Sequence, residues 1–234
     1  MQIKRSCLIC LILILTLAGC ATHKQAFNKA AHQDVKTIGL LEPATSGEFL
    51  VDNLGHPGTG FGLVGGIVAA IDMRSKSKRF TELMKEREFK VVDEFNRMLA
   101  AELQNAGYSV KLLNPERPKQ AFLEDYGGLD KDVDAYLDPT LTVGYFCASV
   151  TADYIPSVRT SLRLVKRGTN EILYQELIAY GYETRQGDAV TIAADNEYCF
   201  KDYGSLAANP EQAMEGLRRG LPLIIKRIAT DLGR

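Results

Sequence analysis

Cys20 is the residue whose neighbours in the sequence most clearly predict a chemical modification. Two basic residues, Lys4 and Arg5, precede an apolar stretch over residues 7–17, and the tripeptide Leu-Ala-Gly stands directly before the cysteine. A charged start, a short apolar core and small residues before a cut are the parts of an export signal. The stretch is shorter than the roughly 20 residues that cross a bilayer. We therefore expect residues 1–19 to be a signal peptide that is removed before Cys20.

The four residues Leu17-Ala18-Gly19-Cys20 resemble the lipobox of bacterial lipoproteins. The resemblance implies that Cys20 becomes the first mature residue and carries acyl chains, palmitate among them, which anchor the protein in a membrane. Ala21 stands where lipoproteins retained in the inner membrane typically carry Asp, so the resemblance implies the outer membrane, on its periplasmic face. The alternative is an ordinary signal peptide, or a short anchor, in which Cys20 is incidental.

Two further cysteines, Cys147 and Cys199, remain in the exported chain. Because the bacterial periplasm oxidises thiols, one alternative is a Cys147–Cys199 disulfide. The other is a pair of buried free thiols, since free cysteine is among the most buried residue types. Both alternatives stay open at this point, because the sequence does not give the distance between the two Cα atoms, which a disulfide limits to about 7 Å.

Residues 58–71 form a glycine-rich apolar insertion. Residues 60–65 match the pattern G-x-G-x-x-G, but Gly55-His56-Pro57 stands where a dinucleotide site needs a strand, so we expect no nucleotide cofactor. Glycine or alanine recurs at every fourth residue, and on a helix these positions would form one smooth stripe that lets another backbone approach: Gly58, Gly62, Gly66 and Ala70. The stripe is either a contact surface for a partner chain or a lipid surface, or an intramolecular lid on the protein's own sheet.

Basic residues follow this insertion, and they suit a lipid surface. They lie within six residues of one another: Arg74, Lys76, Lys78 and Arg79. Such a group can meet anionic lipid headgroups or the phosphates of lipopolysaccharide. The alternative is the solvated start of an ordinary helix.

Few other residues are candidates for catalysis or metal binding. Residues 130–134 begin like a calcium loop, but Ala135 and Leu141 replace the glycine and the glutamate that such a loop needs. A solvated acidic loop is the favoured interpretation, and a looser cation site is the alternative, made of Glu124, Asp125 and Asp138. We expect no metal, no cofactor and no enzymatic activity. An envelope hydrolase with carboxylates that the fold brings together stays as an alternative.

Composition agrees with a folded domain and offers no support for a nucleic-acid partner. The chain has 234 residues, of which 46% are hydrophobic and 24% charged, and this balance is typical of globular proteins. Its formal net charge is −1, so no global positive charge is available to attract a polyanion.

Hydrophobic periodicity predicts alternating strands and helices. Residues 20–34 are polar and aperiodic, so we expect a lipidated tether, and residues 44–57 have the composition of a loop. Apolar residues spaced by three and four predict a helix within residues 80–106, and Asn209-Pro210 predicts the start of a helix that ends at Leu232. Strands are expected at residues 35–41, 109–113, from 133 to about 148, 158–164 and 172–182.

This order predicts an α+β fold: one mixed or antiparallel sheet with helices packed on one face, as a single domain over residues 35–234. In its order of elements the chain resembles the small α/β domain of TolB-type periplasmic translocation proteins and CsgG-type curli-secretion lipoproteins. That resemblance implies a role in envelope assembly, transport or secretion without catalysis, and it assigns no functional residue beyond Cys20.

The sequence therefore predicts a non-enzymatic, membrane-anchored periplasmic lipoprotein of the cell envelope, acting as an adaptor or an assembly or transport factor. Its expected partners are the membrane, through the lipid, and an envelope protein, with a homo-oligomer as a further option. The alternative functions are an oligomeric lipoprotein that resembles a secretion pore, and the hydrolase named above.

Overall fold

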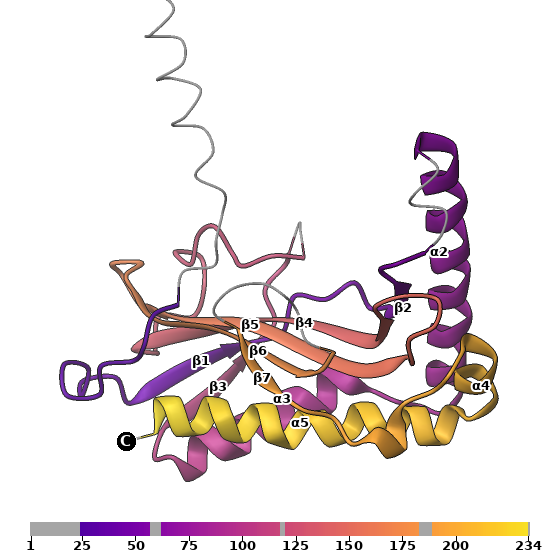
Figure 1. Cartoon of the computed structure of the whole chain (residues 1–234). Helices are drawn as coiled ribbons and strands as arrows, with labels where there is room; N and C mark the ends of the chain where they lie inside the picture. The colour runs from indigo at the N-terminus through magenta and orange to yellow at the C-terminus, as the bar shows by residue number, and fades with distance from the viewer. Residues whose placement is uncertain (1–23, 57–61, 118–119, 183–188, 234) are drawn as a thin grey trace, which may run out of the picture.

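A seven-stranded mixed sheet with helices on one side and at one edge forms the body of the protein (Figure 1). The computed structural model describes residues 24–56, 62–117, 120–182 and 189–233. The predicted signal peptide, Cys20 and Gly58 lie outside these residues. The strands follow in the order β3-β1-β4-β5-β6-β7, with β2 also paired to β4. The predicted α+β class is confirmed.

The long strand β4 (Ala135–Cys147) organises one side of the sheet. Its first part pairs with β1 (Thr37–Leu41) and its last part with β2 (Phe49–Asn53), both in parallel, so β1 and β2 lie end to end along the same edge of β4. Beyond β1 lies β3 (Ser109–Leu113), also in parallel. The prediction of a loop over residues 44–57 is wrong for β2, whose five residues are too few to establish a period.

The other side of the sheet is the predicted hairpin. Strand β5 (Ile155–Lys166) pairs in antiparallel with β4 and with β6 (Ile172–Gly181). The turn between them places Gly168 and Asn170 at φ values of 84° and 57°, a region that glycine and asparagine enter at low cost. The short strand β7 (Val190–Ile192) then runs parallel along β6.

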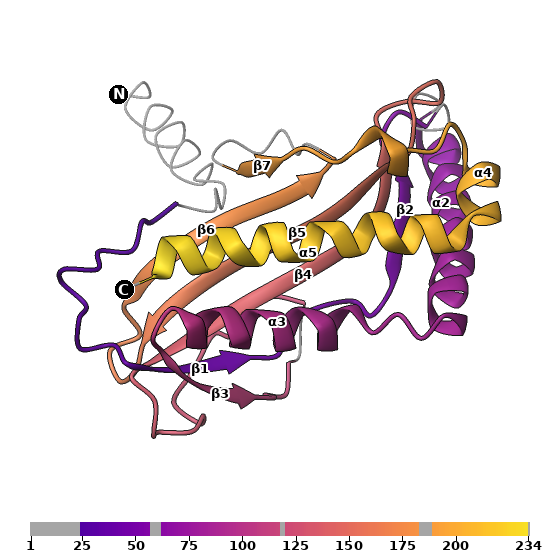
Figure 2. The same cartoon turned by 90° about the horizontal axis from the view of Figure 1, so that it is seen from below.

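Two helices, α3 (Val91–Asn105) and α5 (Pro210–Leu232), lie across one face of the sheet (Figure 2). The predicted stripe of α3 is buried through Phe95, Leu99 and Leu103. After α3, the amides of Gly107 and Tyr108 donate to the carbonyls of Gln104 and Leu103, a Schellman ending with Gly107 at φ 92°. The predicted stop of the helix at Gly107 is therefore confirmed.

Helix α5 begins and ends where the sequence predicts, but its start differs in detail. The side chain of Asn209 does not cap the helix; its amide nitrogen donates to the carbonyl of Ser205 in α4 (Tyr203–Ala208), the short helix just before it. The side chain of Gln212 donates to Glu197 of the 3-10 turn η2 (Asn196–Tyr198), not back to the helix start. These bonds hold the connection between β7 and α5 against the helix.

Helix α2 (Gly62–Glu86) is separate from α3 and lies at an edge of the sheet, not on its face. The prediction of one helical segment over residues 80–106 is wrong between Arg87 and Lys90. There the amides of Glu88 and Phe89 donate to Lys85 and Met84, with Glu88 at φ 52°. This is a second Schellman ending, which could not be predicted because its left-handed residue is not glycine.

Candidate functional site

The first described residues of the chain, from Lys24 onward, are fixed to the domain. Gln25 forms an isolated antiparallel bridge with Gln175 on the outer edge of β6, with backbone distances of 2.8 and 2.9 Å. The Lys24 ammonium lies 3.2 Å from the carboxylate of Glu176, which is only 3% exposed. The expected tether over residues 20–34 is thus wrong for residues 24–34, which we name the N-terminal strap. The polar sequence of the strap did not predict this contact, because the strap is held through its backbone by the open edge of β6.

Side chains hold the rest of the strap. The ring of Phe27 packs against the main hydrophobic core and stacks on His32, with ring centroids 5.7 Å apart. The carboxylate of Asp34 accepts a hydrogen bond of 3.0 Å from Lys166, and this bond is the main cause that lowers the pKa of Asp34. Lys24, which follows Cys20 by four positions in the sequence, is the first described residue and lies at the β6 edge of the domain.

The edge of the sheet at β2, across β4 and β5 from β6, is closed by α2, which runs antiparallel to β2. The hydroxyl of Ser77 accepts from the amide of Val51 at 2.8 Å and lies 3.3 Å from its carbonyl, to which it donates. One turn along, Thr81 makes the same two contacts with Phe49, at 2.9 and 3.4 Å. Both side chains are buried. Two hydroxyls of the helix thus satisfy the edge groups of β2 that another strand would otherwise pair.

The first turns of α2 continue past the end of β2 and carry exposed apolar side chains. Ile67, Val68 and Ile71 are 53%, 57% and 64% exposed, whereas Ala69 is buried. In Figure 1 this end of the helix projects away from the sheet, on the side opposite α3 and α5. We name residues 62–71 the free end of α2.

The predicted glycine stripe falls on this free end. Gly62 and Gly66 are in α2, which confirms a helix from residue 62 onward, and Gly58 lies outside the described residues. A Cβ atom at Gly66 would meet no atom within 4 Å, and Ala70 is exposed. The sheet therefore does not cover these two positions, and the structure does not form the intramolecular lid there.

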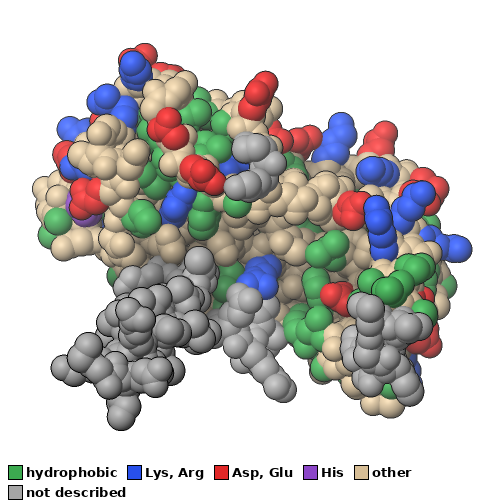
Figure 3. All heavy atoms as spheres, turned by 90° about the horizontal axis from the view of Figure 1, so that it is seen from above, with side chains coloured by type: hydrophobic (Ala, Val, Ile, Leu, Met, Phe, Trp, Pro, Cys, Tyr) green, Lys and Arg blue, Asp and Glu red, His purple; other side chains and the backbone are tan. Residues whose placement is uncertain are grey.

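Neighbouring loops add to the apolar character of this end. Leu54 and Val150 are 55% and 59% exposed. They belong to two loops in contact, because the amide of Leu54 donates to Cys147 and a Cβ atom at Gly55 would lie 2.9 Å from the Cα of Ser149. Seen from above in Figure 3, hydrophobic side chains gather at the end of the molecule where α2 projects. Contiguous exposed apolar surface is uncommon on monomeric proteins and marks contact sites.

Charge changes abruptly beyond Ile71. Asp72 is neutralised by Lys76, 2.6 Å away, and lies 3.6 Å from the imidazole of His56. The next basic side chains point into solvent: Arg74, Lys78 and Arg79. Among the described helices, α2 included, none is both long and apolar enough to cross a membrane.

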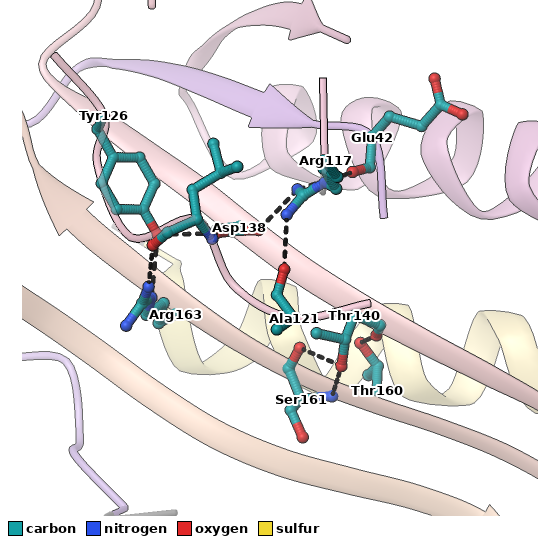
Figure 4. A network of polar contacts seen from close by, with 10 residues as sticks. Glu42, Arg117, Ala121, Tyr126, Asp138, Thr140, Thr160, Ser161 and Arg163 are labelled. Carbon is teal, nitrogen blue, oxygen red and sulfur yellow. Dashed lines mark hydrogen bonds and ion pairs between the residues drawn. The ribbon is translucent and has the colours of Figure 1, made fainter. Parts of the chain in front are cut away.

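A buried polar network holds the connection between β3 and β4 on the face of the sheet opposite α3 and α5 (Figure 4). Asp138 of β4 is fully buried and accepts from Arg117 and Tyr126, both at 2.7 Å, and from the amide of Leu123 at 2.9 Å. Arg163 of β5 donates to the Tyr126 hydroxyl at 3.0 Å. Burial raises the pKa of Tyr126, and the charge of Asp138 adds to the rise, so this phenol stays a proton donor.

These contacts leave the looser cation site unformed. The carboxylate of Asp138 is occupied by an arginine and a tyrosine, and Asp125 accepts from the amide of Gly127 two residues along the chain. Asp130 pairs with Lys111 at 3.2 Å. Among the described residues, no group of three or more histidine, cysteine or acidic side chains is placed to hold a metal ion.

The two cysteines and the two buried carboxylates, Asp138 and Glu176, do not form the arrangements that nucleophilic or acid–base catalysis needs. Cys147 and Cys199 are both free thiols in the structure, but the alternative of two buried thiols fits Cys147 alone, because Cys199 is partly exposed. Burial raises the pKa of each thiol. A raised pKa keeps a thiol protonated and weakly nucleophilic. Asp138 pairs in register with Arg163 on the open face, whereas Glu176 pairs with Leu162 on the helix face. The two carboxylates cannot act on one substrate, because the sheet separates them.

No protein-family model matches the sequence, and no curated protein is similar to it in sequence. Solved structures of similar arrangement are a DUF330 protein from Xanthomonas campestris (8% identity, TM-score 0.36, covering 84% of this chain and 85% of the other) and a PelC dodecamer from Paraburkholderia phytofirmans (8%, 0.35, 91% and 96%). A third is the lipoprotein GNA1162 from Neisseria meningitidis (16%, 0.29, 65% and 87%). Because each TM-score is below 0.5, these similarities carry no argument about function. None of the three is TolB or CsgG, so that resemblance stays a prediction.

Proposed function

We propose that this chain is a non-enzymatic lipoprotein of the bacterial envelope, anchored by acyl chains on Cys20 and serving as an adaptor or as an assembly or transport factor. The proposed site is the periplasmic face of the outer membrane, because Ala21 follows the cysteine. Several acyl chains on one cysteine make a lasting anchor, since each buried CH₂ contributes about 0.8 kcal/mol.

The N-terminal strap is the observation that carries this proposal. A lipid on a long flexible tether would leave the domain free to move away from the membrane. Here the backbone of Gln25 is paired with Gln175, and only three residues stand between Cys20 and Lys24, the first residue that the structure describes. A lipid on Cys20 would therefore hold the β6 edge of the domain beside the bilayer. Close, fixed attachment suits a protein that presents a surface at the membrane.

A role without catalysis is supported by how the polar groups are used. The fully buried carboxylate of Asp138 serves to hold a loop, and the thiols of Cys147 and Cys199 have raised pKa values. The exposed surface that is chemically unusual is the apolar free end of α2, and such a surface suits contact with a lipid or a protein and not turnover of a substrate.

Cys20→Ser tests the anchor. We expect the wild-type chain to sediment with membranes and to incorporate labelled palmitate, and Cys20→Ser to lose the label and most of its membrane association. Cys199→Ser is the matched control, because it removes a partly exposed thiol from the domain and should change neither. Unchanged membrane association and labelling of Cys20→Ser would contradict the proposal. Ala21→Asp tests the destination: we expect it to move the protein from the outer to the inner membrane.

A further inference from the structure

We propose that the free end of α2 inserts into the lipid surface to which Cys20 is anchored, giving the domain a second membrane contact at the opposite side of its sheet. This inference deepens the proposed function and rests on it. It names lipid as the partner of an exposed apolar surface that the domain itself leaves uncovered.

The composition of the free end suits a bilayer. Residues 62–71 contain no charged side chain, and three large ones are more than half exposed: Ile67, Val68 and Ile71. Ten helical residues span about 15 Å, half of the roughly 30 Å hydrocarbon core. This end can therefore enter one leaflet without crossing the membrane. From Gly66 onward its backbone amides are bonded within the helix, as burial in lipid requires, whereas the first four amides of a helix have no partner within it.

Charge at the base of the free end is complementary to a lipid surface. Arg74, Lys78 and Arg79 are exposed within the two turns after Ile71, and the nearest acid, Asp72, is neutralised by Lys76. A helix inserted by its apolar end would bring these cations to the depth of the headgroups, where each one contributes to binding of anionic lipid. A protein partner would not require basic residues to begin where the apolar residues end.

The positions of the two attachments are compatible with one membrane. The chain enters the described part beside β6, and α2 closes the sheet at β2, on the far side of β4 and β5. Contacts at both edges would fix the orientation of the domain, with the face that carries α3 and α5 turned away from the bilayer, because the free end of α2 projects from the other face (Figure 1).

The absence of tryptophan from the sequence allows a direct test. In Val68→Trp the single indole reports the surroundings of the free end, and in Leu223→Trp, at a 44% exposed position on α5, it reports the opposite side of the domain. Both full-length proteins carry the Cys20 lipid and are incorporated into anionic vesicles, with and without brominated acyl chains. We expect both kinds of vesicle to shift the emission of Val68→Trp to the blue and the brominated acyl chains to quench it, with neither change in Leu223→Trp.

Each other result has a defined meaning. Protein that floats with the vesicles while Val68→Trp stays unquenched would overturn this inference and leave the anchor intact. A blue-shifted but unquenched emission would point to another protein copy or partner on the free end, and would equally overturn it. Protein that fails to float would contradict the anchor and this inference together. An unchanged thermal midpoint confirms that both variants fold.

Two further variants separate the apolar from the charged contribution. Ile71→Ser in the Cys20→Ser chain should weaken vesicle binding roughly tenfold or more, because it removes one aliphatic side chain that insertion would bury in lipid. Lys78→Glu with Arg79→Glu should weaken binding to anionic vesicles and leave the weak binding to neutral vesicles unchanged. Equal binding of these variants and their parent to anionic vesicles would overturn the inference.

Discussion

The two halves of α2 reverse the usual distribution of residues between core and surface. The half that lies against the sheet, residues 74–86, uses two buried hydroxyls, Ser77 and Thr81, beside the apolar Phe80 and Met84. The free end is apolar and exposed. Hydroxyls are buried where an open strand edge needs donors and acceptors, and aliphatic side chains are exposed where the domain supplies no cover.

This difference shows that the helix has two separate tasks. Its second half closes the β2 edge and contributes to the stability of the fold. Its first half extends from that support and contributes to stability mainly through its own backbone hydrogen bonds and the buried side chain of Ala69. Substitutions in the two halves should therefore affect different measurements, the free energy of unfolding in one case and membrane contact in the other.

The largest expected effect on stability is at Phe80, which is fully buried and packs edge-on against Tyr145, with ring centroids 5.8 Å apart. We expect Phe80→Ala to lower the free energy of unfolding by about 3–5 kcal/mol, measured by denaturant titration. Ile71→Ala, on the free end, should change it by less than about 0.5 kcal/mol. Similar losses for the two variants would break the distinction between the halves.

The next largest effect on stability is expected at the two hydroxyls of α2 that contact β2. Ser77→Ala leaves the buried amide and carbonyl of Val51 without their helix partner, so we expect a loss of about 1–3 kcal/mol. Thr81→Val should have a similar effect through Phe49. Ser75→Ala changes an exposed serine of the same helix and is the control. A loss no greater than that of the control would show that water replaces these bonds at the β2 edge.

A glycine-to-alanine pair sharpens the comparison because the same change should have opposite signs. Gly66→Ala adds a methyl group that meets nothing within 4 Å, and it should stabilise the helix by about 0.5–1 kcal/mol. Gly216→Ala in α5 places the methyl group 2.6 Å from the hydroxyl of Tyr145, and overpacking there should cost about 1–3 kcal/mol. Thermal midpoints of the two variants measured side by side would test both signs, and destabilisation by Gly66→Ala would show that the free end is packed.

Much of the fold could be predicted from the sequence, namely where a hydrophobic pattern extends over many residues or where a helix begins or ends at a residue type that usually marks such a position. The stripe of α3, its stop at Gly107, the β5–β6 hairpin and the start of α5 at Pro210 all carry such signals. The break between α2 and α3 could not be predicted, because Glu88 takes a left-handed conformation that glycine usually marks.

The candidate site was predicted only in part, because its character depends on what lies beside it. The sequence indicated that Gly62 and Gly66 would share one stripe if their segment were helical, but it could not establish the helix or show that the sheet ends before reaching them. The strap was missed for a similar reason, since Gln25 is held by the unpaired edge of β6 and not by its own apolar character. Two hydroxyls four residues apart, at Ser77 and Thr81, were the signal in the sequence that could have indicated an edge contact.

The most direct test of the account is the mass of the N-terminal peptide of the protein extracted from membranes. We predict that the chain begins at Cys20 and that the peptide carries acyl groups. A chain that still begins at Met1, or a peptide that contains Cys20 without acyl mass, would contradict the lipid anchor and with it the proposed position of the domain at the membrane.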